Sequence, residues 1–556
     1  MTSLDLLERR LHDPGECVLP VMLDRQAAKR PEDTLIIFDD HAEWTYAETA
    51  RIARGTAAAL EERGVSRGHR VLVLMHDSPT MFRLALGIFY LGAIYVPLNP
   101  EFARSVLEDA IEDSDAAIMV SDADLLHNLD GISTGALCQI VAVSDINDET
   151  TRQFADIGIN LLPQSAIAPL KRDPKPLSPA LSAWEHHSIF FSSGTTGEPK
   201  GVVCTYIHTG TMAIDGLRHL QDGERLMSPS AFFHIAGAYV PWAVIAKGGS
   251  MAMVGKFSTS RFWDQVRRLK VNGTVLLGVM VDFLMKAAPK KREKDHPLRF
   301  AVTYPLPNDP IAFKRRFGIE VYTQYDQTEM GPPIICDFIN DDFVAEHGFC
   351  GTLREGYSAR LVDENDCEVE PGDIGELVVR CKVPWVIATE YFENPSATAK
   401  AWRNGWYHTG DRFRVDCASR YYFVDRAANV IRRRGENISS HVLEREAVSH
   451  PSVSAAAAYA VDSEFSEHEI MIAIELIEGS HLSYTEFSDY IASRLPAFMV
   501  PRFVRIVDRL EPNVTNKISK KTLISEGISQ DAWDREKAST LPAYRSNHGP
   551  KSTSQV

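Results

Sequence analysis

The sequence predicts an α/β protein with a large N-terminal domain of layered parallel sheets, a small barrel-like subdomain and a small C-terminal α+β domain. Two changes of pattern along the chain carry this prediction. Apolar runs alternate with helix-like segments in the first part, short alternating strands follow from about residue 345, and the pattern changes again after Arg426. We therefore expect domains at 1–425, with the subdomain at about 345–425, and at 426–525, and a polar, flexible tail at 526–556.

The N-terminal part reads as strands that alternate with helices. Residues 71–98 contain a strand (VLVLM), a helical segment (PTMFRLALGIFYLGA) and a second strand (IYVPL), and a further strand is expected at 117–120. Residues 202–220 are expected to form a helix. Residues 262–269 have helical spacing, and residues 274–279 are strand-like. Alternation of this kind predicts parallel sheets covered by helices.

The C-terminal part shows two different sequence patterns. The runs GELVVR at 375–380 and RYYFVDR at 420–426 alternate as strands of a small antiparallel or barrel-like subdomain do. Beyond them, residues 442–449 are helical, and strands are expected at 454–461 and 469–476. Residues 484–495 form an amphipathic pattern, with Phe487, Ile491 and Leu495 on one stripe.

Composition excludes some classes of function. The chain has 556 residues, is 44% hydrophobic, and carries a formal charge of -16, which argues against a nucleic-acid-binding protein. Its eight cysteines are scattered, with no metal-binding spacing, as in reduced cytosolic proteins. The longest apolar stretch, 84–98, is too short for a bilayer. We expect a cytoplasmic protein without integral membrane association; the oligomeric state stays open, with a homodimer as one alternative.

The most informative segment is the loop at 192–201, SSGTTGEPKG, which follows the apolar run Ile189-Phe190-Phe191. Glycines let backbone amides approach an anion closely, and hydroxyls and a lysine add donors. The loop therefore suits a polyphosphate, although its spacing is not that of the Walker motif. The alternative is an ordinary solvated loop.

Four further segments combine aromatic, hydroxyl and charged residues. Residues 322–329 (YTQYDQTE) follow a strand-like run, at the kind of strand end where α/β sheets bind ligands. Residues 406–411 (WYHTGD) place a carboxylate after a glycine turn, which suits ribose hydroxyls. Asp425-Arg426 precedes RRRGEN at 432–437, and residues 513–520 (NVTNKISK) lie near the end of the globular region.

In order and spacing, these five segments resemble the adenylate-forming superfamily of acyl-CoA synthetases, peptide-synthetase adenylation domains and luciferases. The resemblance covers roughly residues 25–525, and within it the chain is most similar to the carnitine/crotonobetaine–CoA ligase branch. It implies an enzyme with ATP, Mg²⁺ and CoA as cofactors. A carboxylate attacks the α-phosphate of ATP to give acyl-adenylate and pyrophosphate, and a thiol then displaces AMP.

The resemblance also implies roles for single residues. Thr195, Thr196 and Lys200 hold the β- and γ-phosphates, Thr328 contacts the α-phosphate, and Glu329 carries Mg²⁺. The other phosphate-loop residues that bind the nucleotide are Ser192, Ser193, Gly194 and Gly197.

Further roles concern the nucleoside, the acid and CoA. Tyr325 stacks on adenine, and Asp411, helped by Arg426, takes the ribose hydroxyls. Lys517 bridges the α-phosphate and the carboxylate, and Gly435 lines the tunnel for the pantetheine arm of CoA. The C-terminal domain is expected to be mobile and to rotate about Asn429, so that it presents Lys517 in one step and the Gly435 loop in the other.

Each of these residues has a structural alternative. Tyr325 can belong to the core, Asp411 can cap a turn, and the arginines at 432–434 can form a solvated face. Lys517 lies near Lys520 and Lys521, so only its position in the motif distinguishes it.

The chain departs from the family pattern at several positions. Asp326 replaces a usual glycine, and its charge should repel a triphosphate unless a cation compensates. Asn516 replaces the glycine before the catalytic-type lysine, and Asn429 is uncharged at the usual hinge. The segment Tyr304-Pro-Leu-Pro-Asn308 replaces the usual glycine-rich adenine strand.

The acid is expected to contact Phe233, His234, Tyr304 and Gly331. An aspartate near the His234 position binds the α-ammonium group in amino-acid-activating relatives, so histidine disfavours a free α-amino acid here. The aromatic residues Phe232, Phe233, Tyr239 and Trp242 either enclose a quaternary ammonium group or belong to the core. Carnitine-like acids are therefore one hypothesis for the substrate.

Three functions remain in view. The first is an AMP-forming acyl-CoA ligase. The second is a stand-alone adenylation enzyme that loads a carrier protein in trans, because no carrier domain fits after residue 525. The third is a catalytically weak nucleotide-binding regulatory protein, which only Asp326 and Asn516 favour.

Overall fold

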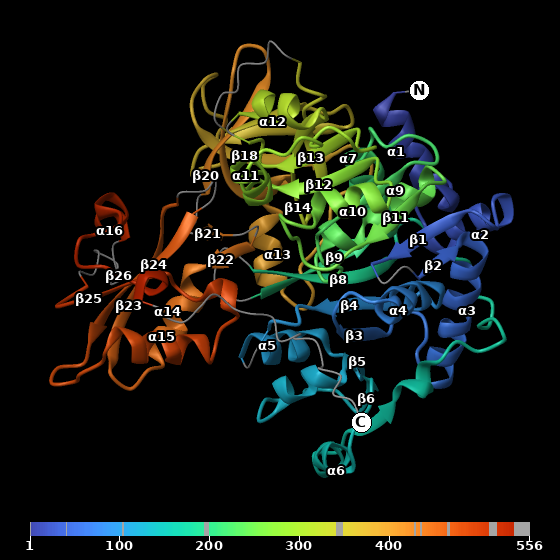
Figure 1. Ribbon diagram of the computed structural model, residues 1–556, viewed down its shortest axis with the longest axis horizontal. Helices are drawn as coiled ribbons and strands as arrows, with labels where there is room; N and C mark the ends of the chain where they lie inside the picture. Colours follow the sequence, from blue (N-terminus) through green and yellow to red (C-terminus); the bar gives the residue numbers. More distant parts are fainter. Residues whose placement is uncertain are drawn as a thin grey trace. The chain divides into compact units, whose positions relative to one another are not determined.

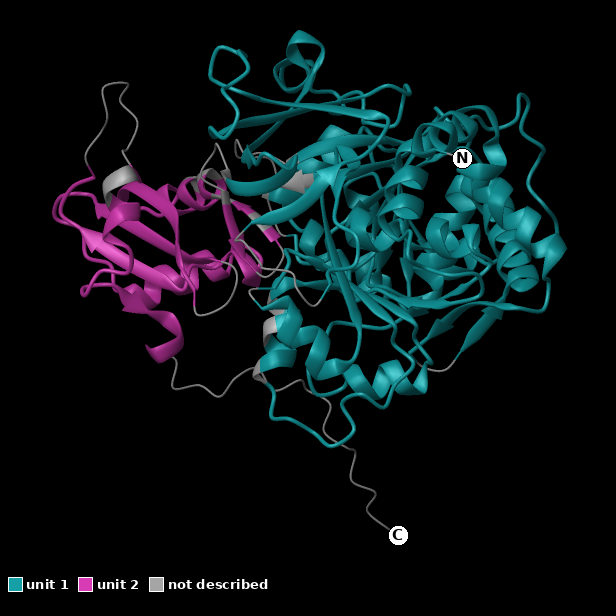
Figure 2. Ribbon diagram, turned by 90° about the horizontal axis from the view of Figure 1, so that it is seen from above, with its two compact units in different colours: residues 1–429, 465–467 teal, residues 430–464, 468–556 magenta. Residues whose placement is uncertain are grey.

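The protein folds into two compact units (Figure 2). The computed structural model describes residues 2–39, 42–102, 105–193, 199–307, 309–340, 348–426, 430–433, 436–463, 468–510 and 520–538. Unit 1 comprises Met1–Asn429 and Phe465–Glu467, and unit 2 comprises Val430–Glu464 and His468–Val556. None of the helices in the described ranges combines the length and the apolar character that a membrane span needs.

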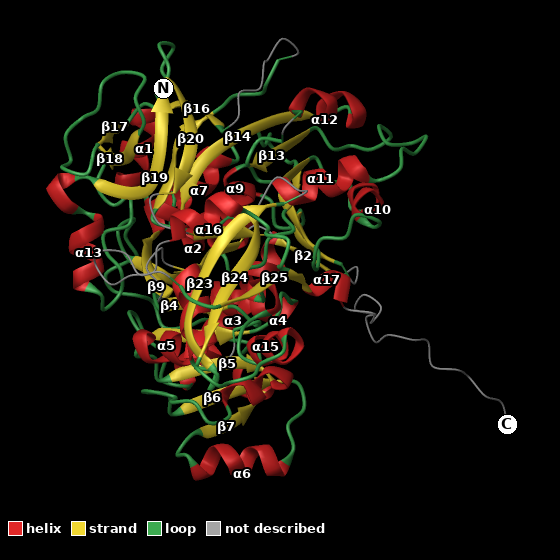
Figure 3. Cartoon of the chain, turned by 90° about the vertical axis from the view of Figure 1, so that its left-hand side faces the viewer, coloured by secondary structure: helices red, strands yellow, loops and turns green. Residues whose placement is uncertain are grey.

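The first sheet of unit 1 has seven strands in the order β7-β6-β5-β3-β4-β8-β9. All neighbours are parallel except β8 and β9, which form an antiparallel pair at one edge. In Figure 3, β5, β6 and β7 lie side by side, with α6 beyond them. The strands are β3 (Arg70–Leu74), β4 (Ile94–Leu98), β5 (Ile118–Asp122), β6 (Gln139–Val143), β7 (Asn160–Pro163), β8 (His186–Ser193) and β9 (Pro199–Thr205).

Strand β3 shows why this sheet forms. Val71 and Val73 point to the hydrophobic cluster that contains α4, whereas Leu72 and Leu74 point to the cluster that contains α5. Successive side chains of a strand face opposite sides of the sheet, so a strand covered by helices on both faces needs an unbroken apolar run. The predicted strand–helix–strand unit at 71–98 is confirmed as β3, α4 and β4.

The second sheet joins thirteen described strands in the order β17-β18-β19-β20-β16-β15-β14-β13-β12-β10-β11-β1-β2. Strands β14, β13, β12, β10, β11 and β1 are parallel neighbours in this order. From β14 to β17, every pair of neighbouring strands is antiparallel. The strands are β1 (Thr34–Phe38), β2 (Glu43–Thr45), β10 (Arg225–Met227), β11 (Ser250–Met253), β12 (Gly273–Leu277), β13 (Phe300–Tyr304), β14 (Glu320–Gln327), β15 (Met330–Ile335), β16 (Phe349–Leu353), β17 (Tyr357–Val362), β18 (Gly375–Cys381), β19 (Tyr407–Val415) and β20 (Arg420–Arg426).

The helices of unit 1 cover these sheets (Figure 1). Their starts follow the capping rules: the Ser78 hydroxyl accepts from the Met81 amide at 3.1 Å, with Pro79 as the first residue of α4. The helices are α1 (Ser3–His12), α2 (Leu19–Lys29), α3 (Tyr46–Glu62), α4 (Pro79–Tyr90), α5 (Ser105–Ser114), α6 (Asp148–Asp156), α7 (Tyr206–Gly216), α8 (Ile235–Ala238), α9 (Val240–Ala246), α10 (Phe262–Arg268), α11 (Gly278–Lys286), α12 (Pro310–Phe317) and α13 (Pro395–Ala401).

The prediction of a helix over 202–220 is wrong at both ends. Residues up to Thr205 belong to β9, which pairs with β8 in antiparallel register, and α7 occupies only Tyr206–Gly216. The physical reason is local. Val202 and Val203 are β-branched and suit a buried strand, and the Thr205 hydroxyl caps the helix by accepting from the His208 amide at 3.3 Å.

Unit 2 contains a four-stranded sheet in the order β23-β24-β25-β26 and a separate hairpin of β21 and β22. Ala457, Tyr459, Met471 and Phe503 are buried in its core. Its elements are β21 (Val430–Arg433), β22 (Glu436–Ser439), α14 (Ser440–Val448), β23 (Val453–Asp462), β24 (His468–Leu476), α15 (Tyr484–Ala492), β25 (Phe503–Val507), α16 (Lys520–Glu526), β26 (Trp533–Asp534) and α17 (Arg535–Ala538).

The prediction of a flexible tail at 526–556 is wrong for its first part, which is folded. Trp533 and Asp534 form β26, and the Trp533 ring stacks on Tyr484 with centroids 5.8 Å apart. Asp534 also pairs with Arg502 at 3.3 Å. The segment is polar and aperiodic, so no periodicity in the sequence reveals these contacts or the pairing of β26 with β25. Residues 539–556 lie outside the described residues.

Candidate active site

The predicted phosphate loop connects β8 to β9 at the edge of the seven-stranded sheet. Its described backbone ends are paired, with Ser192 opposite Lys200 and Ser193 opposite Pro199. Gly201 is buried at the start of the following strand segment, where a Cβ would lie 2.8 Å from a methyl carbon of Ile189. Of the loop residues, Gly194, Thr195, Thr196 and Gly197 lie outside the described residues, as do the side chains of Ser192 and Ser193.

Lys200, Tyr391 and Glu329 lie together beside this loop. The Tyr391 hydroxyl donates a hydrogen bond to Glu329 Oε1 at 2.8 Å. The Lys200 Nζ lies 5.0 Å from the centroid of the Tyr391 ring, in a cation–π arrangement. Burial lowers the pKa of Lys200, and the charge of Glu329 acts in the opposite direction. A lysine and a carboxylate from different sheets thus share one tyrosine.

The segment at 387–392 connects these two sheets. Its backbone bridges Val202 through Tyr391 and Met330 through Ile387. The Ala388 amide also donates to the Glu329 carbonyl oxygen at 2.8 Å, and the Phe392 amide donates to that of Gly201 at 2.7 Å. These bonds fix Tyr391 between the lysine of β9 and the glutamate of the β14–β15 turn.

One face of β14 points to Asp411. The Tyr325 hydroxyl and the Gln327 amide nitrogen donate to Asp411 Oδ2, at 2.8 Å and 2.9 Å. Tyr325 and Gln327 are two residues apart and share a face because side chains alternate along a strand. The Tyr325 ring meets the edge of Phe413 with centroids 4.7 Å apart. The predicted adenine and ribose residues are therefore neighbours.

The turn that carries Asp411 is held from β18. Glu376 accepts the Gly410 amide at 3.0 Å through Oε1, and its Oε2 lies 3.2 Å from the His408 ring nitrogen. Gly410 has a φ of +71°, which favours glycine in the WYHTGD segment. Asp411 is 2% exposed, and the backbone of Arg426 is its partner in the β19–β20 register.

The other face of β14 points to Tyr304. Gln324 donates through Nε2 to the Tyr304 hydroxyl oxygen and, at 2.9 Å, to Asp326 Oδ2. The Tyr304 hydroxyl lies 3.4 Å from the same carboxylate oxygen. Asp326 was expected beside the triphosphate. It lies on the face of β14 opposite to Tyr325 and Asp411, beside Tyr304 and Gln324, and its effect on a triphosphate stays a prediction.

The remaining acid-pocket candidates lie on separate elements. Phe233 and His234 contact each other, with ring centroids 4.5 Å apart, just before α8. The preceding Phe232 amide donates to Asp77 at 3.0 Å. Gly331 is buried in β15, where a Cβ would lie 3.3 Å from the Tyr357 hydroxyl oxygen and 3.5 Å from the Met212 backbone.

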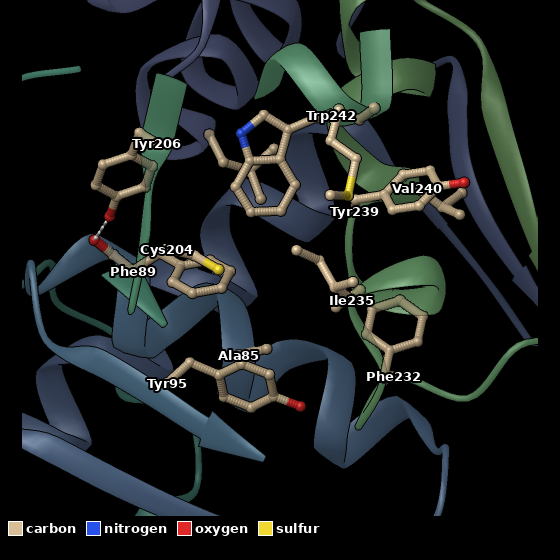
Figure 4. Packing of buried hydrophobic residues seen from close by; sticks show 14 of the residues in the cluster. Ala85, Phe89, Tyr95, Cys204, Tyr206, Phe232, Ile235, Tyr239, Val240 and Trp242 are labelled. Carbon is tan, nitrogen blue, oxygen red and sulfur yellow. Dashed lines mark hydrogen bonds between the residues drawn. The ribbon is translucent and has the colours of Figure 1, made fainter. Parts of the chain in front are cut away.

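Of the four aromatic residues considered for an ammonium cage, Phe232, Tyr239 and Trp242 belong to the buried core. Figure 4 shows Trp242 facing Phe89 in a buried cluster, and their ring centroids are 5.7 Å apart. Trp242 also donates from its indole nitrogen to the Cys17 carbonyl oxygen at 2.7 Å. Phe232 contacts Phe82, and both rings belong to the core. Core packing is thus the correct interpretation for Phe232, Tyr239 and Trp242, and Phe232 and Trp242 pack against Phe82 and Phe89 of α4.

Comparison with known proteins identifies the family. Residues 23–391 match the profile of the AMP-binding enzyme, and residues 443–517 match the AMP-binding enzyme C-terminal domain. The chain belongs to the AMP-binding enzyme family. It is therefore a member of the adenylate-forming superfamily, as its motifs predict.

Relatives and solved structures agree with this assignment. Crotonobetaine/carnitine–CoA ligases from Shigella flexneri and from Escherichia coli O9:H4 (strain HS) are each 29% identical over 495 residues, covering 86% of this chain and 93% of theirs. The fold is similar to that of o-succinylbenzoate CoA synthetase from Bacillus subtilis (TM-score 0.77, 21% identity, 91% of this chain and 98% of that one). It is also similar to the amide bond synthetase McbA from Marinactinospora thermotolerans (TM-score 0.76, 20% identity, 90% and 99%).

Several residues predicted for this AMP-binding enzyme stay predictions. Lys517, Gly435 and Asn429 lie outside the described residues, and so do Asn516 and the side chain of Arg426. Thr328 is half-buried in the turn between β14 and β15, next to Glu329, which is 8% exposed.

Sequence reasoning missed four residues of this site: Tyr391, Gln327, Glu376 and Gln324. Tyr391, Gln327 and Gln324 form hydrogen bonds with the predicted residues Glu329, Asp411 and Tyr304, and Glu376 accepts from the amide of Gly410, the neighbour of Asp411. Gln324 and Gln327 stand inside the quoted YTQYDQTE segment, where alternation along the strand assigns them to opposite faces. Tyr391 and Glu376 lie outside the motifs, and only the tertiary structure identifies them.

Proposed function

We propose that this enzyme is an ATP-dependent acyl-CoA ligase of the AMP-forming type. It activates a carboxylic acid as acyl-AMP, releases pyrophosphate, and transfers the acyl group to the thiol of CoA. The observation that carries the proposal is the meeting of Lys200 and Glu329 at Tyr391, beside the β8–β9 loop. Membership of the family and the CoA-ligase names of the relatives support CoA as the acceptor.

The first step brings two anions together, because a carboxylate attacks the α-phosphate of a triphosphate. Cations and amide donors must therefore neutralise the developing charge. Lys200, half-buried in β9, supplies one such cation. The ring face of Tyr391 holds the ammonium group of Lys200 in place, so the long lysine side chain has less rotamer freedom to lose when the nucleotide binds.

Mg²⁺ fits the residues present. Glu329 offers a buried carboxylate that accepts a hydrogen bond from Tyr391, and Mg²⁺ prefers hard oxygen ligands from one or two carboxylates together with phosphates and water. When bound, the ion supplies positive charge to the phosphates. Tyr391 orients the carboxylate that holds it.

We assign the nucleoside to the face of β14 that carries Tyr325 and Gln327. Asp411 is held in place by Tyr325, Gln327 and the turn around Gly410, and its carboxylate is expected to accept the ribose hydroxyls. The direct bond between Tyr325 and Asp411 links the adenine and ribose subsites into one rigid unit.

The test is an acid-dependent ATP–pyrophosphate exchange screen over aliphatic, aromatic and betaine acids, with carnitine and crotonobetaine included. We expect exchange with at least one class, followed by thioester formation when CoA is added. Thioester on a carrier protein but not on CoA would favour a carrier-loading adenylation enzyme. Absence of exchange with every acid would favour a nucleotide-binding regulatory protein.

A further inference from the structure

One amide side chain joins two strands of unit 1 that stand apart in their sheet. Gln327 ends β14, and the sheet order places β15, β16 and β20 between β14 and β19. The Gln327 side chain nevertheless forms hydrogen bonds with three alternate residues of β19, which are Tyr407, Thr409 and Asp411. Alternate residues of a strand share a face. Gln327 therefore lies across the face of β19 that carries Asp411, the residue expected to accept the ribose hydroxyls.

The hydrogen bonds allow only one orientation of the Gln327 amide. Its Nε2 donates to the Thr409 carbonyl oxygen and to Asp411 Oδ2, each at 2.9 Å, and a carbonyl and an ionised carboxylate can only accept. On the other side, Oε1 accepts the Tyr407 hydroxyl at 2.7 Å. A flipped amide would turn its oxygen toward two acceptor oxygens. Tyr407 thus favours the orientation in which the amide donates to Asp411.

Tyr407 is itself held by its surroundings. It is 3% exposed, and its ring packs on Trp402 with centroids 4.9 Å apart. The same Trp402 ring packs on Tyr391 with centroids 5.3 Å apart, and Tyr391 donates to the Glu329 carboxylate. The side chains that orient Asp411 and Glu329 therefore share one aromatic support.

A carboxylate that is already oriented recognises a ribose hydroxyl at a lower cost than a mobile one. Asp411 Oδ2 accepts both the Gln327 amide and the Tyr325 hydroxyl, so two donors from β14 define the orientation of the carboxylate. Hydrogen bonds to a charged group are stronger than those between neutral groups. If the Gln327 donor is lost, part of this gain is spent on ordering Asp411 when the nucleotide binds.

We propose that Tyr407 and Gln327 are positioning residues for the selection of the nucleotide: Tyr407 orients the Gln327 amide, and this amide orients Asp411 toward the ribose hydroxyls. The inference rests on the proposed function and deepens its ribose subsite. It assigns to Tyr407 an effect on ribose recognition that passes through Gln327.

The test measures the affinity of the purified enzyme for AMP, 2′-deoxy-AMP and 3′-deoxy-AMP by titration calorimetry, which requires no acid substrate. We expect the wild type to bind AMP about 10- to 100-fold more tightly than at least one deoxy form, because the deoxy form lacks a hydrogen bond to a carboxylate. In Tyr407→Phe and in Gln327→Met, this ratio should fall by about fivefold, because Asp411 has to be ordered on binding. The double variant should show no further fall than Gln327→Met, because Tyr407 acts through Gln327.

The control is Tyr422→Phe, which removes a buried hydroxyl from the neighbouring strand β20, where Tyr422 donates to Asp416 at 3.1 Å. It should lower the free energy of unfolding in urea about as much as Tyr407→Phe does and keep the wild-type ratio.

An unchanged ratio in Tyr407→Phe, or a further fall in the double variant, would overturn the inference and leave the proposed ligase intact. So would a wild type that binds both deoxy forms as tightly as AMP. Equal weakening of all three nucleotides in Tyr407→Phe leaves the ratio unchanged and would mark a merely structural residue. Absence of AMP binding together with absence of acid-dependent exchange would instead count against the proposed function.

Discussion

Glu329 and Lys200 illustrate how single side chains create the site. Each comes from a different sheet, and Tyr391 contacts both, through its hydroxyl and its ring face. The contribution of Tyr391 is to hold two groups of opposite charge near the same loop, so that less reorganisation is needed when ATP binds.

For the exchange activity, the charge of the Glu329 carboxylate is predicted to matter far more than its hydrogen bond with Tyr391. Glu329→Gln should lower kcat of acid-dependent exchange by about 100-fold or more, because the amide is a poor ligand for Mg²⁺. Tyr391→Phe should cost about one hydrogen bond, roughly three- to tenfold. Exchange assays with a titration of Mg²⁺ check both values. Equal losses in the two variants would contradict separate roles.

Asp77 carries a predicted pH dependence. Burial raises the pKa of this carboxyl from 3.8 to about 6, although it accepts the Phe232 amide. The folded protein then holds the proton more tightly than the unfolded chain does. The stabilising contribution is complete below about pH 4 and is lost as the pH rises through about 6.

The measurement is the free energy of unfolding of the wild type minus that of Asp77→Asn, between pH 4 and pH 7. We expect this difference to fall as the pH rises, because asparagine does not titrate. A difference that is flat or that rises with pH would contradict the raised pKa.

At the scale of elements, one buried carboxylate ties three segments together. Asp215 of α7 pairs with Arg10 of α1 at 2.7 Å and with Arg354, which follows β16, at 2.6 Å. The two arginines hold the pKa of Asp215 at about 2, against the effect of burial. This pairing positions α7, whose other residues contact β15 and Gly331.

Asp215→Asn is therefore predicted to destabilise unit 1 strongly. It leaves two buried arginines without their counter-charge, and breaking a buried pair in this way costs about 3–5 kcal/mol. Urea unfolding measures this loss of stability, and Asp222→Asn, in the exposed turn that follows α7, is the control. A loss below about 1 kcal/mol would mean that water reaches the two guanidinium groups.

Elements also show what the sequence can and cannot predict. The strands and helices of 71–98 follow from apolar runs that stop at turn residues, and α15 follows from its stripe of Phe487 and Ile491. The strand β9 was missed because its residues continue without a break into α7. β26 was missed because two residues, held by Tyr484 and Arg502, have no period to detect.

The same limit applies to the site. Motif spacing predicts Glu329, Tyr325 and Asp411, because these residues stand in short, ordered segments. It does not reveal Tyr391 or Glu376, whose roles depend on contacts between residues 62 and 34 positions apart. Nor does it reveal that Asp326 contacts Gln324 and Tyr304, on the face of β14 opposite to Tyr325.

At the scale of the whole molecule, the chain is built of two units with separate cores. The resemblance to adenylate-forming enzymes implies that the smaller unit serves each half-reaction with a different residue. Lys517 is expected to act in adenylation and Gly435 in thioester formation.

Two variants test this division. Lys517→Ala should abolish acyl-adenylate formation and keep thioester formation from premade acyl-adenylate, because it removes only the cation at the α-phosphate. Gly435→Leu should do the reverse, because a side chain would block the pantetheine arm. Single-turnover assays of each half-reaction measure both. Parallel losses in both half-reactions would contradict the alternation.

The most direct measurement for the whole account follows the products of one reaction mixture. Purified enzyme, ATP, Mg²⁺, CoA and the acid that gives the fastest exchange are incubated, and acyl-AMP, AMP, pyrophosphate and thioester are quantified by mass spectrometry over time. The account predicts that acyl-AMP forms without CoA, and that adding CoA converts it to thioester and AMP in equal amounts. ADP and phosphate in place of AMP and pyrophosphate, or a thioester that forms without acyl-AMP, would contradict it.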